Sequence, residues 1–197
     1  PGVIVDASHP QLNSVFVDNV AGGRLATEHL IDLGHEKIAY ISDYPDNPFN
    51  HSPVIDRYEG YCQALKQAGI PRRADYYRAG SLDSQEARGL AVGLLSLDDP
   101  PTAIFAYSDT QAIGVLEAAR ELEYRVPDDL SVVGYDDIEA ADYVQLTTAR
   151  QSLFDSGVKG AQLLLDVMER SILAPQKIVL PTELVIRSST SAPARVL

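Results

Sequence analysis

Two short apolar runs constrain the fold of this chain more than any other feature of its sequence. Ala103–Ala106 and Leu130–Tyr135 contain no charged residue, and polar pairs follow them closely, Ser108-Asp109 after the first and Asp136-Asp137 after the second. Uninterrupted apolar runs of this length are typical of strands covered on both faces, as parallel strands are. The segment between the runs is amphipathic and has the length of a helix. The sequence therefore predicts a β-α-β unit.

The two polar pairs predict a binding site. In an open parallel sheet the carboxyl ends of the strands share one edge, and ligands bind in the crevice beyond that edge. Because both pairs follow the ends of their strands, we expect Ser108 and Asp136 to lie at this edge.

The rest of the chain continues the alternation of strands and helices, which predicts an α/β protein. Further strands are predicted at Val3–Val5, Val15–Val17, Ile38–Ile41, Tyr76–Ala79, Lys177–Leu180 and Glu183–Ile186. Helices are predicted at Ala21–Leu33, Arg57–Ala68, Asp83–Leu95 and Leu153–Ile172. In the last helix the residues expected to face inward are Ala161, Leu164, Leu165 and Met168. The tail after Ser188 is expected to be loosely ordered.

The charge of the chain limits its partners. With 28 acidic and 16 basic residues the net charge is −12, so phosphate backbones repel this surface and we expect no direct binding of nucleic acid. No apolar run approaches the length of a membrane span. The single cysteine fits a reducing compartment, and we expect a cytoplasmic protein without a membrane partner. A strand-like run directly after Pro1-Gly2 suggests a fragment of a longer protein.

Motifs of catalysis and of cofactor binding are missing from the sequence. The four histidines have no zinc-like spacing, and no glycine-rich phosphate loop or nucleophile elbow occurs. We therefore expect neither an enzyme nor a bound cofactor.

Several segments, taken in order, resemble the effector-binding domain of the LacI/GalR family of bacterial transcriptional repressors. They are VFVDN at 15–19, AGGRLATEHLIDLGHEKIAYIS at 21–42, RYEGYCQAL from Arg57, the stretch 101–139 that contains SVVGYDDIE, and LTTARQS from Leu146. The resemblance implies a periplasmic-binding-protein-like fold of two parallel-sheet subdomains joined by three crossovers. It places an incomplete first subdomain at 1–35 and 150–190, a complete second subdomain at 36–149 and a tail at 191–197.

The resemblance also implies partners. A small-molecule effector, either a sugar or a purine-like compound, would bind in the cleft between the subdomains. A homodimer would form through a region that includes Tyr143 and Leu146. Operator DNA would be bound only through an N-terminal helix-turn-helix that is absent from this sequence. The alternative is a periplasmic sugar-binding transport receptor, which shares the fold.

Two residues lead the candidate site. Asp136 resembles the family's effector-binding aspartate, and a carboxylate suits hydroxyl or ring N–H donors because it only accepts. The alternative role is a solvated carboxylate in a turn. Arg57 resembles the family's effector-clamping arginine, whose planar fork holds two oxygens at once. Its alternative role is an ion pair within its own helix, with Asp56 or Glu59.

Four further residues complete the prediction. Ser108 stands where the family has asparagine and is expected to face the cleft, while Asp109 is expected to cap the following helix. Asp6 and Gln151 are expected to make further ligand contacts. Phe49 either stacks on a sugar or purine face or packs its own loop.

Overall fold

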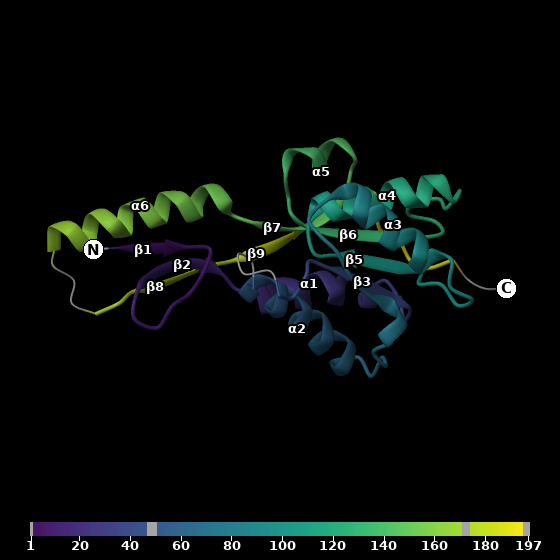
Figure 1. Cartoon of the computed structure of the whole chain (residues 1–197), viewed down its shortest axis with the longest axis horizontal. Coiled ribbons are helices and arrows are strands. Elements are labelled where there is room, and N and C mark those ends of the chain that lie inside the picture. The colour runs from purple at the N-terminus through teal and green to yellow at the C-terminus, as the bar shows by residue number, and fades with distance from the viewer. Residues whose placement is uncertain (1, 47–50, 171–173, 195–197) are drawn as a thin grey trace.

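The computed structural model of the chain describes residues 2–46, 51–170 and 174–194 and contains two separate sheets (Figure 1). The smaller sheet has the order β1-β2-β8, formed by Val3–Val5, Asn13–Val17 and Lys177–Leu180. The larger has the order β4-β3-β5-β6-β7-β9, formed by Tyr77–Ala79, Ile38–Ser42, Ala103–Ala106, Ser131–Asp136, Thr147–Gln151 and Thr182–Val185. Only the β7–β9 pair among these strands is antiparallel. The predicted α/β fold with parallel sheets is confirmed.

Helices cover both faces of the six-stranded sheet. Their bounds are α1 Asn19–Asp32, α2 His51–Gln67, α3 Ser84–Leu95, α4 Asp109–Glu121, α5 Glu139–Tyr143 and α6 Leu153–Arg170. Along β3, Ile38 and Tyr40 pack with α1 and α2, while Ala39 and Ile41 pack with α3 and α4. Every residue of this strand is therefore buried, which explains why the apolar run has no polar alternation.

Helix α1 belongs with the six-stranded sheet. We expected residues 1–35 to form part of the first subdomain, but Ala26 and Leu30 of α1 pack in the core that lies under α2. Strand β9 likewise pairs with β7. The division into subdomains stays a prediction, and this packing favours placing α1 and β9 with residues 36–149.

The chain passes between the two sheets three times. It leaves β2 for α1 at 17–19, leaves β7 for α6 at 151–153, and leaves β8 for β9 at 180–182. The predicted three crossovers are therefore present. In Figure 1 they lie between the end of the molecule that carries α6, β1, β2 and β8 and the end that carries the large sheet.

The predicted inward face of α6 is wrong. Ala161, Leu165 and Met168 are exposed and Leu164 is half-buried, and the row that meets the small sheet is instead Ser156, Gly160, Leu163 and Val167. A side chain at 160 would clash with Val5, because a Cβ there would lie 2.7 Å from Val5 Cγ2. Small residues therefore seat the helix on the sheet, although the opposite stripe is more apolar.

The C-terminal segment from Ser188 to Ala194 is ordered, contrary to our prediction. The hydroxyl of Ser189 donates to the Val132 carbonyl at 2.6 Å and accepts from the Thr147 amide at 2.8 Å. The carbonyl of Ser191 lies 2.9 Å from Nε2 of buried His35. These bonds hold the segment against β6 and β7. Within the described residues no helix has the length and apolarity needed to cross a membrane.

Candidate ligand-binding site

Arg57 and Asp136 meet at the carboxyl edge of the six-stranded sheet. Arg57 comes from α2 and Asp136 ends β6, and Arg57 Nη1 lies 3.5 Å from Asp136 Oδ1. Arg57 Nε also donates to Asn19 Oδ1 at 2.9 Å, and its Nη1 donates to the Tyr107 carbonyl at 2.8 Å. The guanidinium thus joins the ends of β2, β5 and β6. Arg57 is only 5% exposed, so its charge is held inside this junction.

Aromatic rings and glycines hold Arg57 in place. Its Cζ lies 3.6 Å from the centre of the Tyr135 ring and 4.4 Å from that of Tyr107, and such cation–π contacts are stronger when they are buried. A Cβ at Gly23 would lie 2.2 Å from the Arg57 carbonyl, and one at Gly60 would lie 2.2 Å from the Val20 carbonyl. The two glycines therefore allow α1 and α2 to approach until Arg57 reaches Asn19.

The environment of Asp136 favours a hydrogen-bonding role. Burial raises the pKa of Asp136, while the Arg57 guanidinium and the Gln151 amide oppose that rise. Gln151 Nε2 donates to Asp136 Oδ1. The backbone at Asp136 has φ 111°, and at Asp137 φ is 58°. Two successive non-glycine residues with positive φ make this a strained turn that surrounding contacts must hold.

Hollows lie on two sides of this junction. One of about 350 Å³ is lined by Asp136, Gln151 and the start of α6. Another of about 270 Å³ is lined by residues that include Asp6, Asn19 and Asp56. Asp136 lines the first hollow and Asn19 the second, and both side chains contact Arg57, which itself lines neither hollow.

The structure separates the other predicted residues. Gln151 touches Asp136, whereas Asp6 lies across the smaller hollow and accepts from Ser156 Oγ at 2.9 Å. Ser108, not Asp109, is the N-cap of α4, and its Oγ accepts from the Gln111 amide at 3.3 Å. The capping prediction was therefore wrong, because the helix begins one residue earlier than we expected. Phe49 lies outside the described residues.

Asp109, at the start of α4, is instead a buried carboxylate that links the end of β6 to β7 by hydrogen bonds. Its Oδ1 accepts from Thr148 Oγ1 at 2.6 Å and its Oδ2 accepts from the Ile138 amide at 2.9 Å. Burial raises the pKa of Asp109 to about 7, although both hydrogen bonds oppose the rise. A carboxyl with no exposure is therefore close to half-protonated at neutral pH.

The two predicted interface residues differ. Tyr143 is 78% exposed and free to meet another molecule. Leu146 has no exposed surface and packs in the core with Leu130 and Val132, so its prediction as an interface residue is wrong. The apolar character of Leu146 reflected the core that α5 covers.

Sequence reasoning missed three residues of the site. Asn19, Tyr107 and Tyr135 all contact Arg57. Asn19 comes two residues after the end of β2. The rule that selected Asp136, a polar residue just after the carboxyl end of a parallel strand, would therefore have found it. The tyrosines gave no such signal, because an aromatic residue at a strand end also reads as core. Among the described residues, no group of histidine, cysteine, aspartate or glutamate side chains could hold a metal ion.

Comparison with known proteins gives consistent matches. A family model described as a periplasmic binding protein-like domain matches residues 27–190. The HTH-type transcriptional repressor PurR of Mannheimia succiniciproducens is 34% identical over 193 residues, which cover 96% of this chain and 57% of PurR. The chain thus spans little more than half of that relative.

Solved structures agree. The LacI-family regulator from Enterococcus faecium with bound ribose superposes with a TM-score of 0.85 at 32% identity, covering 98% of this chain and 71% of that one. The CelR–cellobiose complex gives a TM-score of 0.85 at 32% identity, covering 95% of this chain and 57% of that one.

The chain belongs to the periplasmic binding protein-like domain family. Its fold and its matches are those of the effector domains of LacI-family transcriptional regulators, as its sequence motifs predicted.

Proposed function

We propose that this chain is the effector-sensing part of a LacI-type transcriptional repressor and binds a sugar or a similar small polar molecule beside Arg57 and Asp136. The observation that carries the proposal is the buried contact between these two side chains at the carboxyl edge of a parallel sheet. Two structural relatives hold ribose and cellobiose, which supports a sugar-like effector.

The chemistry of the junction suits hydroxyl groups. Within the described residues, Asp136 Oδ2 and Arg57 Nη2 take part in no hydrogen bond. One accepts and the other donates, so together they match a hydroxyl or a ring edge that does both. Gln151, and Asp6 across the smaller hollow, would add contacts from the segments that lead to the small sheet.

Linkage supplies the mechanism. A ligand that touches both ends of the molecule stabilises one relative orientation of the two sheets, and the three crossings carry that change. DNA-binding segments elsewhere in the longer protein would gain or lose operator affinity in response. We further propose that the intact protein is a cytoplasmic homodimer without catalytic activity, with Tyr143 at its interface. The repressor names of the relatives favour this role over a transport receptor.

A thermal-shift screen with neutral sugars, nucleosides and purine bases tests the proposal, because a ligand that binds only the folded state raises the melting temperature. For each hit, Asp136→Ala should weaken binding by about 1–3 kcal/mol in titration calorimetry, since it leaves a buried donor unpaired. Asp142→Asn, an exposed aspartate six residues later, is the matched control. Equal affinity in the two variants would remove Asp136 from the site.

A further inference from the structure

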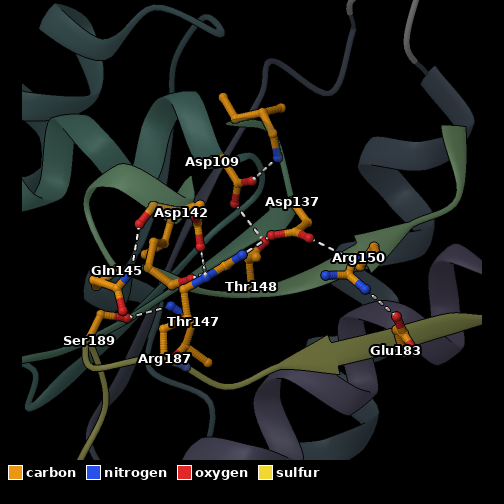
Figure 2. Close-up of polar contacts among 12 residues, drawn as sticks. Asp109, Asp137, Asp142, Gln145, Thr147, Thr148, Arg150, Glu183, Arg187 and Ser189 are labelled. Atoms are coloured by element: carbon orange, nitrogen blue, oxygen red, sulfur yellow. Dashed lines mark hydrogen bonds and ion pairs between the residues drawn. The ribbon is translucent and has the colours of Figure 1, made fainter. Parts of the chain in front are cut away.

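The carboxylate of Asp137 lies between two arginines. Its Oδ2 accepts from Arg150 Nε at 2.6 Å, and its Oδ1 lies 2.8 Å from Arg187 Nη1 (Figure 2). The Asp137 side chain is 9% exposed and that of Arg187 is 11% exposed. Burial alone would raise the pKa of Asp137, but the two guanidinium groups outweigh burial and hold the pKa below its ordinary value. Asp137 is therefore ionised and paired at neutral pH.

The two arginines come from β7 and from the segment after β9, the strands at which two of the three crossings begin and end. Arg150 lies in β7, one residue before the strand ends and the chain leaves for α6. Arg187 lies two residues after β9, which the chain reaches directly from β8. Arg150 also pairs with Glu183 of β9 at 2.6 Å. One carboxylate thus ties β7, next to its crossing to α6, to the segment that follows β9, at the end of β9 opposite to its crossing from β8.

The same residue sits in the strained turn that carries Asp136. Asp136 and Asp137 both have positive φ, and the Ile138 amide that follows is held by Asp109. Such backbone strain persists only where the surroundings over-determine it. The Asp109 bond to Ile138 and the two arginine pairs of Asp137 are among the contacts that hold the turn, and Figure 2 draws the arginine pairs.

We propose that Asp137 is a positioning residue that fixes the relative orientation of the two sheets by clamping β7, beside its crossing, and the far end of β9 to the turn that carries Asp136. The part of this inference that concerns the effector rests on the proposed function. A ligand that hydrogen-bonds to Asp136 moves the turn, and Arg150 and Arg187 move with the turn because they pair with Asp137. The clamp is the rigid link between the binding residue and the crossings.

The partners of the clamp differ in burial, which provides a matched control. Arg187 Nε also lies 3.3 Å from Asp142 Oδ1, but the Asp142 side chain is 72% exposed. Exposed pairs contribute little, whereas breaking a buried pair leaves a desolvated charge without its counterion. Asp137→Asn and Asp142→Asn each remove one negative charge from Arg187, and only the first should loosen the crossings.

Pulsed electron–electron double resonance on the ligand-free chain tests the clamp without any effector. Spin labels at Lys159→Cys on α6 and Arg120→Cys on α4, in a Cys62→Ser background, report the separation of the two ends of the molecule; both sites are exposed. We expect one narrow distance population in the unmutated background and in Asp142→Asn. In Asp137→Asn we expect a second population or a clearly broadened one.

An unchanged distribution in folded Asp137→Asn overturns the proposal, and so does equal broadening in Asp142→Asn. If Asp137→Asn does not fold by circular dichroism, Arg150→Gln decides, because that half-exposed arginine is replaced without burying a new charge. Broadening in Arg150→Gln supports the clamp and an unchanged distribution overturns it. Failure of the effector screen would leave these distances unaffected, so the two proposals fail separately.

Discussion

The two sheets of this molecule are built from similar apolar strands but are buried to different degrees. Strands β3 and β5 of the large sheet are buried at every residue, whereas β1 and β8 of the small sheet are largely half-buried or exposed. Helices cover both faces of the large sheet, while α6 is the helix that packs on the small one. An apolar strand therefore indicates that a cover is needed, but its sequence does not say which segment provides it.

Helix α6 makes the same point from the other side. Its inner row, which includes Leu163, is buried against β1 and β2, while Phe154 on the outer stripe is 82% exposed and Met168 is 61% exposed. The outer stripe repeats every three or four residues, as a packed helix face does. The core of the large sheet is covered on both faces, whereas the small sheet and α6 leave apolar side chains exposed.

The largest expected effect is on the free energy of unfolding, when one leucine from each core is replaced by alanine. Leu94→Ala, in the core between the large sheet and α3, should lower the free energy of unfolding by about 3–5 kcal/mol, because tight packing on all sides prevents collapse into the cavity. Leu163→Ala should cost about 2 kcal/mol or less, because α6 can settle toward the small sheet. Urea unfolding followed by circular dichroism measures both. Equal losses would mean that the two cores are equally constrained.

The same contrast explains what the sequence could predict. Runs such as Ala103–Ala106 have both neighbours and both covers within the chain, so pattern alone located the strands, their order of connection and the polar edge. The meeting of Arg57 with Asp136 followed from family motifs placed on that edge. These predictions succeeded because local pattern and tertiary packing agree there.

The predictions were wrong where the local sequence allowed two arrangements and tertiary packing determined which of them formed. Helix α6 has two apolar stripes, and the row with Ser156, Gly160 and Leu163 faces the sheet, while Leu165 and Met168 face outward. The tail from Ser188 looks polar and unstructured, yet Ser189 and Ser191 supply the side-chain hydrogen bonds that pin it. Asp109 looks like a cap, but Ser108 one residue earlier takes that place. None of these choices is visible from periodicity.

A smaller effect concerns pH and the large sheet alone. Because the pKa of Asp109 is raised to about 7 from an ordinary value of 3.8, the folded state holds a proton that the unfolded state releases between these pH values. Stability attributable to Asp109 therefore falls as pH rises from about 4 to about 7 and is constant above that. Relative to Asp109→Asn, whose amide can donate to a reversed Thr148 hydroxyl, the loss should reach about 1–3 kcal/mol.

Urea unfolding of the two proteins at pH 4.5, 6.0 and 7.5 measures this difference. The Asp109→Asn variant provides the baseline for the other titrating groups, which both proteins share. They include His29 and His35, whose pKa values burial lowers. A difference that stays flat across the three pH values would show that Asp109 is ionised throughout.

The smallest expected effect lies on the outer stripe of α6. Leu165→Gln should change the free energy of unfolding by less than about 0.5 kcal/mol, because that side chain is 52% exposed and fills no core. Leu163→Gln, two residues earlier, places an amide in the apolar contact with Val15 and Val17 and should cost several times more. The same urea titration compares the pair. A large loss of unfolding free energy in Leu165→Gln would mean that the outer stripe is covered in solution. The difference in burial between the large sheet and the small one would then not hold.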